Sequence, residues 1–119
     1  MRDFHKLKVW EKAHRLTLAA YKAAAQFPKA EYYDLARQLR RAAASIPANI
    51  AEGCGLSGQA DIVRFLHIAM GSASEAEYHL QLARDLALLN ADLHDHLARE
   101  VTEVKRMLTS LAHKLKADR

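Results

Sequence analysis

Residues 93–115 carry the pattern that most restricts what this chain can fold into. Large apolar residues recur there at steps of four and three, at Leu93, Leu97, Val101, Val104, Leu108, Leu111 and Leu115. This spacing puts them on one side of an α-helix and is typical of the inward seam of a left-handed helical bundle. Asn90 stands just before the pattern and is a suitable N-cap. The chain therefore contains a long amphipathic helix that has to pack against others.

Three further segments repeat this character. Apolar residues at helical spacing run through residues 6–26, 30–53 and 58–89, and Phe27-Pro28 and a group of glycines separate them. A chain of 119 residues is long enough for one core. We therefore predict an all-α protein, an antiparallel up-down-up-down four-helix bundle, with residues 1–119 as a single domain.

Glycine and proline positions refine this prediction. Gly53 is expected to take a left-handed conformation at a helix end, and Ser57 is expected to cap the next helix. Pro47 removes the hydrogen bond to the carbonyl of Ala43 and is expected to kink its helix. Glycine inside a helix lowers the stability of that helix by about 1 kcal/mol. Close approach of a neighbouring helix is therefore the expected reason for Gly71.

The cysteine content and the N-terminus indicate a cytoplasmic protein. Cys54 is the only cysteine, so no intrachain disulfide can form. In Gly-Cys-Gly it is either an exposed thiol at a turn or a small residue tolerated at a helix end, and the second interpretation is favoured. The first residues are charged and do not resemble a signal peptide. The longest uncharged apolar stretch, residues 42–51, is about half of what spans a bilayer.

The positive charge is uneven. Residues 1–55 hold 10 Lys and Arg against 5 Asp and Glu, a net of +5, whereas residues 56–119 hold 8 against 9, a net of −1. A basic half can attract a polyanion, and structured RNA needs little more than clustered cations. Aromatic residues do not interleave the cations, so stacking on single strands is not indicated. The candidate nucleic-acid-binding residues, expected to form one basic face across the first two helices, are Lys8, Lys12, Arg15, Arg37, Arg40 and Arg41.

Polar residues within the apolar stripes suggest a half-buried network between helices. If the second and third helices form an antiparallel hairpin, Arg37 or Arg41 would pair with Glu75. Glu52 or Asn49 would similarly meet the start of the first helix. We predict a structural role in helix register rather than catalysis. The predicted structural polar network comprises Arg41, Asn49, Glu52, Ser72 and Glu75.

Metal and catalytic motifs are scarce. Carboxylate-bridged bundles need two Glu-x-x-His pairs, and this chain has one, Glu11 to His14. There is no nucleophile elbow and no glycine-rich phosphate loop. We therefore predict no metal, no cofactor and no enzymatic activity.

One run of residues resembles a known family. It extends from Gln38 to Gly53 as Gln-Leu-Arg-Arg-Ala-Ala-x-Ser-Ile-Pro-x-Asn-Ile-Ala-Glu-Gly, with Gly71-Ser-x-x-Glu75 downstream. With Phe4-x-x-Leu7-x-Val9-Trp10 near the start, it is similar to the 23S-rRNA intervening-sequence protein family of bacteria, also called the four helix bundle or S23 family. The resemblance covers nearly the whole chain, and Ala76, where the family more often has leucine, is a minor departure.

The resemblance implies an antiparallel four-helix bundle that in several members assembles as a homopentamer. The chain is also distantly similar to the accessory variability protein of diversity-generating retroelements, a basic pentamer that binds RNA and a reverse transcriptase. For most members no biochemical role is established, and the family supplies no catalytic residue.

Two hypotheses follow. The first is a non-enzymatic, oligomeric bundle that binds structured RNA through a basic surface. The alternative is a protein–protein scaffold or adaptor with no nucleic-acid role.

Overall fold

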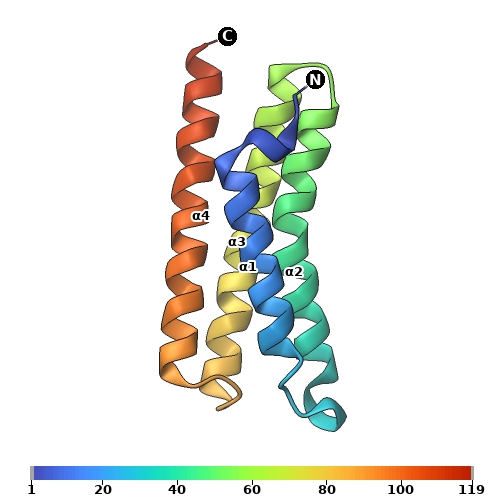
Figure 1. The fold of residues 1–119 in the computed structure, drawn as a ribbon, viewed down its shortest axis with the longest axis vertical. Coiled ribbons are helices and arrows are strands. Elements are labelled where there is room, and N and C mark those ends of the chain that lie inside the picture. Colours follow the sequence, from blue (N-terminus) through green and yellow to red (C-terminus); the bar gives the residue numbers. More distant parts are fainter. Residues whose placement is uncertain (1, 119) are drawn as a thin grey trace.

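The computed structural model describes residues 2–118 as four long helices after one short turn. The 3₁₀ turn η1 (Phe4–Lys6) precedes α1 (Lys8–Ala24), α2 (Lys29–Gly55), α3 (Gln59–Asp85) and α4 (Ala91–Ala117). Successive helices are joined at alternate ends, so sequence neighbours run antiparallel (Figure 1). The predicted all-α four-helix bundle is confirmed.

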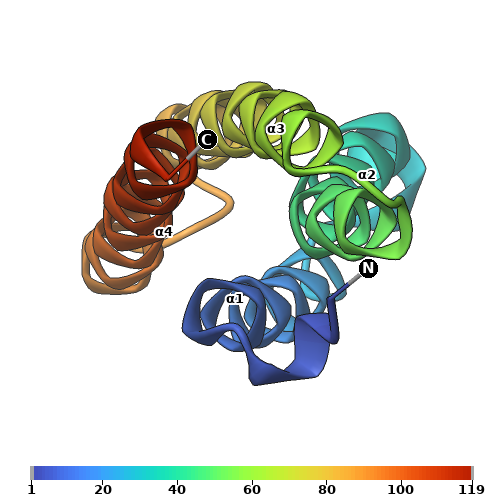
Figure 2. The ribbon, with the colours of Figure 1, turned by 90° about the horizontal axis from the view of Figure 1, so that it is seen from above.

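Three of the helices determine the length of the molecule, which measures 48 × 22 × 19 Å. Helices α2, α3 and α4 have 27 residues each, or about 40 Å, whereas α1 has 17. Seen from above, the bundle is more open between α1 and α4 than between other neighbours (Figure 2). No helix within residues 2–118 combines the length and the apolar character needed to cross a membrane.

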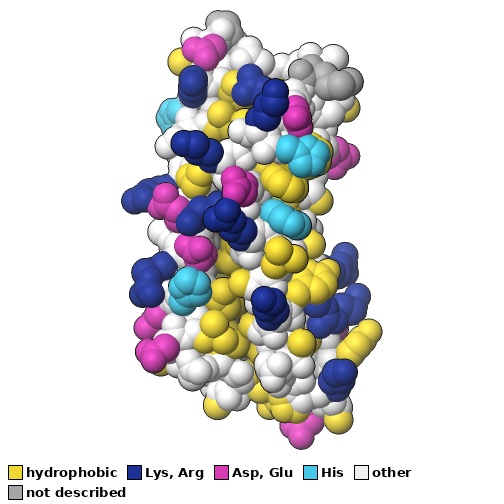
Figure 3. Space-filling model, viewed as in Figure 1, with side chains coloured by type: hydrophobic (Ala, Val, Ile, Leu, Met, Phe, Trp, Pro, Cys, Tyr) yellow, Lys and Arg dark blue, Asp and Glu magenta, His cyan; other side chains and the backbone are white. Residues whose placement is uncertain are grey.

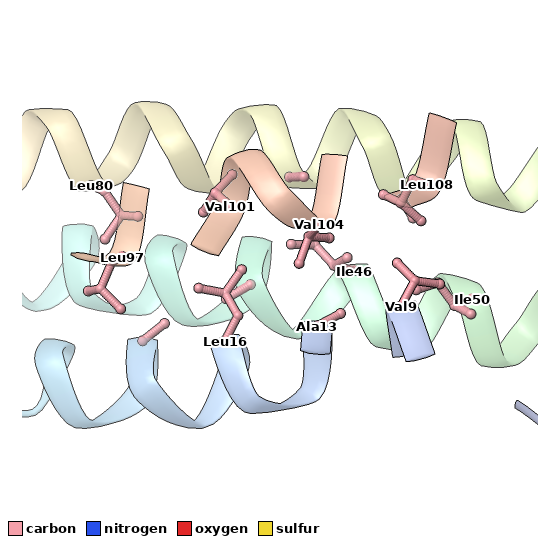
Figure 4. Packing of buried hydrophobic residues seen from close by; sticks show 14 of the residues in the cluster. Val9, Ala13, Leu16, Ile46, Ile50, Leu80, Leu97, Val101, Val104 and Leu108 are labelled. Carbon is pink, nitrogen blue, oxygen red and sulfur yellow. The ribbon is translucent and has the colours of Figure 1, made fainter. Parts of the chain in front are cut away.

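The core lies along the bundle axis, where the predicted seam of α4 meets the other three helices (Figure 4). Leu97, Val101, Val104 and Leu108 are at most 1% exposed. Leu93 was expected in this seam but is 37% exposed. An α-helix turns about 100° per residue, so each four-residue step exceeds a full turn by about 40°. Two such steps separate Leu93 from Val101 and place Leu93 about 80° away from the buried face.

The ends of α3 differ from their predicted positions. The N-cap is Gly58, which has no side-chain capping bond, so the prediction for Ser57 was wrong. The helix ends at Asp85, before the predicted residue 89, because the chain turns in a Schellman motif. The N–H of Leu88 donates to the carbonyl of Ala83 at 2.8 Å, and Ala87 takes the left-handed conformation with φ 64°. At the start of α4, Asn90 accepts a bond from the N–H of Leu93 at 2.8 Å, as predicted.

Pro47 lies within α2 without disturbing its backbone angles. The one non-helical residue in α2 is Tyr32, with φ −122° and ψ 23°. The carbonyl that Pro47 leaves without a backbone donor, that of Ala43, accepts a hydrogen bond from the hydroxyl of Thr17 on α1 at 3.0 Å. The buried Thr17 hydroxyl also lies 2.9 Å from the carbonyl of Ala13. A side chain of the neighbouring helix thus satisfies the carbonyl at the proline.

The two glycines singled out in the sequence do not take the roles that were expected of them. Gly53 has a negative φ, so the expected left-handed stop is not formed there. A Cβ at Gly53 would lie 2.8 Å from the Cβ of Phe65 and 3.3 Å from the Cα of Ile62, so Gly53 lets α2 and α3 approach closely. Gly71, where close packing was expected, is exposed, and no other helix of the described chain comes within 4 Å of its Cβ position.

The thiol of Cys54 is buried inside the bundle rather than exposed at a turn. Its exposed fraction is 0%, and it lies within the last turn of α2. Burial raises the pKa of the thiol above its usual value. Cys54 is therefore a core residue, and its thiol is neutral near pH 7.

Candidate nucleic-acid interface

Three arginines, Arg37 and the adjacent Arg40 and Arg41, lie within about one turn of one another on α2. The guanidinium of Arg40 lies over the ring of Tyr21 on α1, 5.9 Å from its centroid. Arg37 pairs with Asp34 one turn earlier, at 3.3 Å. Arg41 is exposed and has no carboxylate within 4 Å in the described part of the chain. These side chains project on both sides of α2, towards α1 and towards α3.

A polar depression of about 340 Å³ lies between α2 and α3. Arg37 and Arg41 line it from α2, and Glu75 lines it from α3. The structure thus brings these predicted partners together, but the expected ion pair between them is not formed within residues 2–118. The carboxylate of Glu75 lies instead 3.2 Å from His79, one turn along α3. Partners within one helix need less side-chain ordering than partners across the bundle.

A second depression of about 400 Å³ lies between α1 and the start of α2. Three tyrosines and two cations line it, together with Phe27 and small residues; they are Tyr21, Tyr32, Tyr33, Lys29 and Arg40. No carboxylate is among the lining residues. Sequence reasoning missed this group because its members come from two different helices. Only the antiparallel pairing of α1 with α2 brings Tyr21 next to Arg40.

Taken together, the two depressions give α2 a positive outer surface. We call Lys29, Arg37, Arg40 and Arg41 the α2 basic surface. Three carboxylates accompany it: Asp34 pairs with Arg37, Glu75 lines one depression, and Glu31 lies in the first turn of α2 beside Lys29. Four cations against three carboxylates leave a net charge of +1 at this surface.

The remaining candidate cations lie elsewhere. Lys12 pairs with Glu100 of α4 at 3.1 Å, and Lys8 lines a groove between α1 and α4. Arg15 pairs with Glu11 along α1. Lys8 and Lys12 therefore face α4, whereas Arg37 and Arg41 face α3. The six predicted residues do not form the single face that was expected, because their helices turn them towards different neighbours.

The predicted polar network is also not a connected set. The side-chain amide of Asn49 donates to the carbonyl of Ser45 in the same helix, at 2.7 Å. Glu52 is exposed and Ser72 is half-buried, and neither side chain makes a hydrogen bond to residues 2–118. Counting residues along the hairpin placed Glu75 near Arg37 and Arg41 but could not fix the side-chain rotamers.

The groove between α1 and α4 combines an apolar lining with cations. It measures about 470 Å³, and Leu7, Met107 and Leu111 form its apolar part. Lys8 and Lys114 stand at its edge, with Arg106, which pairs with Glu103.

Metal-binding groups are not assembled in the described chain. Within residues 2–118, no group of three or more His, Cys, Asp or Glu side chains lies close enough to hold a metal ion. His79 is 7% exposed, and its Nδ1 has no hydrogen-bond partner among these residues.

The pKa of the Asp3 carboxyl lies below its usual value because its oxygen accepts hydrogen bonds from His5. Asp3 is exposed and caps the η1 turn.

The fold and this surface define a small all-α bundle with arginines concentrated on its second helix. Comparison with known families gives the particular group. The chain belongs to the 23S rRNA-intervening sequence protein family, whose profile matches residues 5–110.

A solved structure supports the same assignment. The chain is similar to a protein of unknown function from the S23 ribosomal protein family of Bacteroides thetaiotaomicron VPI-5482, with 26% identity and a TM-score of 0.77. The match covers 87% of this chain and 97% of that one. No curated protein matches the sequence significantly. The comparisons indicate no enzyme family.

Proposed function

We propose that this protein is a non-enzymatic bundle that binds structured RNA through the α2 basic surface. The observation that carries the proposal is the excess of cations around the two depressions that flank α2, with Arg41 exposed and unneutralised within residues 2–118. Phosphate contacts need clustered Lys and Arg side chains that are not already neutralised by neighbouring carboxylates. The family's printed association with 23S rRNA intervening sequences supports RNA as the polyanion.

Charge reversal on α2 tests this function. Arg41→Glu and Arg40→Glu proteins, freed of nucleic acid by nuclease, are titrated with a labelled rRNA stem-loop at low salt. We expect each to bind at least about tenfold more weakly than the unaltered protein, which is about 1.4 kcal/mol. Arg99→Glu is the matched control, because Arg99 is exposed on α4, diagonally across the bundle from α2 (Figure 2). Equal losses for all three variants would show a non-specific charge effect.

We further propose that the protein forms a homo-oligomer through the outer face of α3, with a pentamer as the expected state. Ile68 and Tyr78 on this helix are 43% and 59% exposed. Gly71 lies between them on nearly the same side, and within residues 2–118 no atom of another helix lies within 4 Å of its Cβ position. A second copy packed there would give Gly71 the close-approach role expected from the sequence.

The rival function, a protein scaffold, also has a specific support. The groove between α1 and α4 combines an apolar floor with Lys8 and Lys114 at its edge, which suits an acidic amphipathic segment of another protein. If the protein fails to bind RNA at low salt, where electrostatic attraction is strongest, the scaffold becomes the better hypothesis.

A further inference from the structure

The depression between α1 and α2 has a composition that a phosphate contact alone does not use. Tyr21 and Tyr33 are 47% and 60% exposed, and Tyr32 is half-buried beside them. Single exposed aromatic residues are ordinary on protein surfaces. Three tyrosines around one concave site of about 400 Å³ are a different arrangement. Figure 3 shows hydrophobic and basic side chains side by side over the lower parts of α1 and α2.

Local structure explains how the tyrosines gather there. Phe27 is 3% exposed and fixes the connection between α1 and α2 to the core. The backbone departs from helical angles at Tyr32, so the first turn of α2 is offset from the rest of the helix. The tyrosines at positions 32 and 33 therefore lie beside the end of α1, where Tyr21 supports the guanidinium of Arg40.

We propose that this depression, the tyrosine groove, holds one unpaired nucleobase of a structured RNA. The proposal deepens the RNA-binding function above and rests on it. A base is flat and can stack on a tyrosine ring, and this interaction is tolerant of base identity. The adjoining phosphates carry negative charge, and Lys29 and Arg40 line the groove with no carboxylate among its lining residues. An acidic peptide would satisfy the cations but would leave the exposed tyrosine rings without stacking partners.

Two RNA hairpins test the proposal. They share one stem and loop, and one of them carries a single bulged nucleotide while the other is fully paired. Fluorescence anisotropy gives the Kd of each for the full chain. We expect the bulged hairpin to bind about tenfold more tightly, which is the size of effect that one stacked base produces.

Tyr33→Leu is the variant to compare, because it removes the ring at an exposed helical position and keeps an apolar side chain. It should abolish the preference for the bulged hairpin and leave the affinity for the paired hairpin within about twofold. Leu18→Ala is the control, since Leu18 is 51% exposed on α1 and lies outside both the groove and the proposed contact on α3. It should keep the full preference. Ultraviolet crosslinking of the bulged hairpin should attach the nucleotide to the peptide that spans residues 21–33.

The outcomes separate this inference from the function on which it rests. If both hairpins bind equally and Tyr33→Leu changes nothing, the groove does not hold a base, while RNA binding stands. If Tyr33→Leu alters the mass of the assembly but not the preference, the groove is a contact between copies and the inference is overturned. If neither hairpin binds at low salt, the RNA-binding function itself fails.

Discussion

The hydroxyl of Thr17 takes the place of the backbone N–H that Pro47 lacks. Its bond to the carbonyl of Ala43 joins α1 to α2 in the core, at a distance of 3.0 Å. A buried carbonyl without a donor costs about 1–3 kcal/mol. Pro47 and Thr17 therefore form a pair, although 30 positions separate them in the sequence.

Thr17→Val should lower the free energy of unfolding by about 1–3 kcal/mol, because it keeps the shape and removes the donor. Thr102→Val is the control. The exposed hydroxyl of Thr102 bonds only within its own helix, to the carbonyl of Ala98 four residues earlier, at 3.0 Å. It should stay within about 0.5 kcal/mol of the unaltered protein. Urea denaturation followed by circular dichroism measures both.

Adding Pro47→Ala turns this comparison into a double-mutant cycle. Alanine at position 47 supplies a backbone donor to the carbonyl of Ala43, so Thr17→Val should cost less in that background. Purely additive effects would show that the hydroxyl does not serve that carbonyl.

Cys54 gives a chemical test of the core at the same scale. Since burial raises the pKa of its thiol, the native protein should react slowly with iodoacetamide at pH 8 and quickly once unfolded in urea. A thiol ionises more readily in the unfolded chain, so this group stabilises the fold below pH of about 8.5 and the stabilisation declines as the pH rises further. Fast native labelling, read by mass spectrometry, would contradict the buried position.

At the scale of elements, the contact between α2 and α3 depends on Gly53. Gly53→Ala should lower the free energy of unfolding by about 1–3 kcal/mol, because its methyl group would lie 2.8 Å from the Cβ of Phe65. A Cβ cannot rotate away as the end of a long side chain can. Gly55→Ala is the control two residues further on, where nothing lies within 4 Å. Equal stability of the two variants, measured by thermal unfolding, would refute the close approach.

The turn between α3 and α4 offers a stabilising change. Ala87 has φ 64° at the position of the Schellman motif that glycine usually takes. Ala87→Gly should raise the free energy of unfolding by about 0.5–1 kcal/mol, since it relieves this conformation. Ala48→Gly, in an exposed and helical position, should lower it by about 1 kcal/mol. A loss of stability from both would show that Ala87 is not held in the left-handed region.

How far the sequence predicts the structure differs between elements and side chains. The spacing of Leu97, Val101 and Leu108 predicts α4 and its buried face, because burial is a property of one helix and its period. The partners of Glu75 and Asn49 are not predicted, because side-chain rotamers decide them. Each side chain turns to a residue of its own helix, Glu75 to His79 and Asn49 to the carbonyl of Ser45. The tyrosine groove is not predicted either, since it exists only when α1 and α2 pair.

At the scale of the whole molecule, the first question is assembly. Light scattering on the purified chain should give a mass near 67 kDa, which is five times 13.4 kDa. Ile68→Glu should reduce the mass, because a charge on the outer face of α3 opposes its burial. Leu18→Glu is the control, because Leu18 on α1 is 51% exposed, compared with 43% for Ile68. A mass of one chain for the unaltered protein would contradict the proposed oligomer.

The central claim is that the α2 basic surface contacts RNA phosphates, and the salt dependence of binding tests it most directly. We would measure Kd for an rRNA stem-loop from about 50 to 200 mM salt, with the unaltered protein, Arg41→Gln and Arg99→Gln. The logarithm of affinity should fall linearly with the logarithm of salt concentration, by about 0.9 for each phosphate contact. Arg41→Gln should flatten this slope by about one contact, and Arg99→Gln should leave it unchanged. A slope that is the same for all three proteins would contradict the claim.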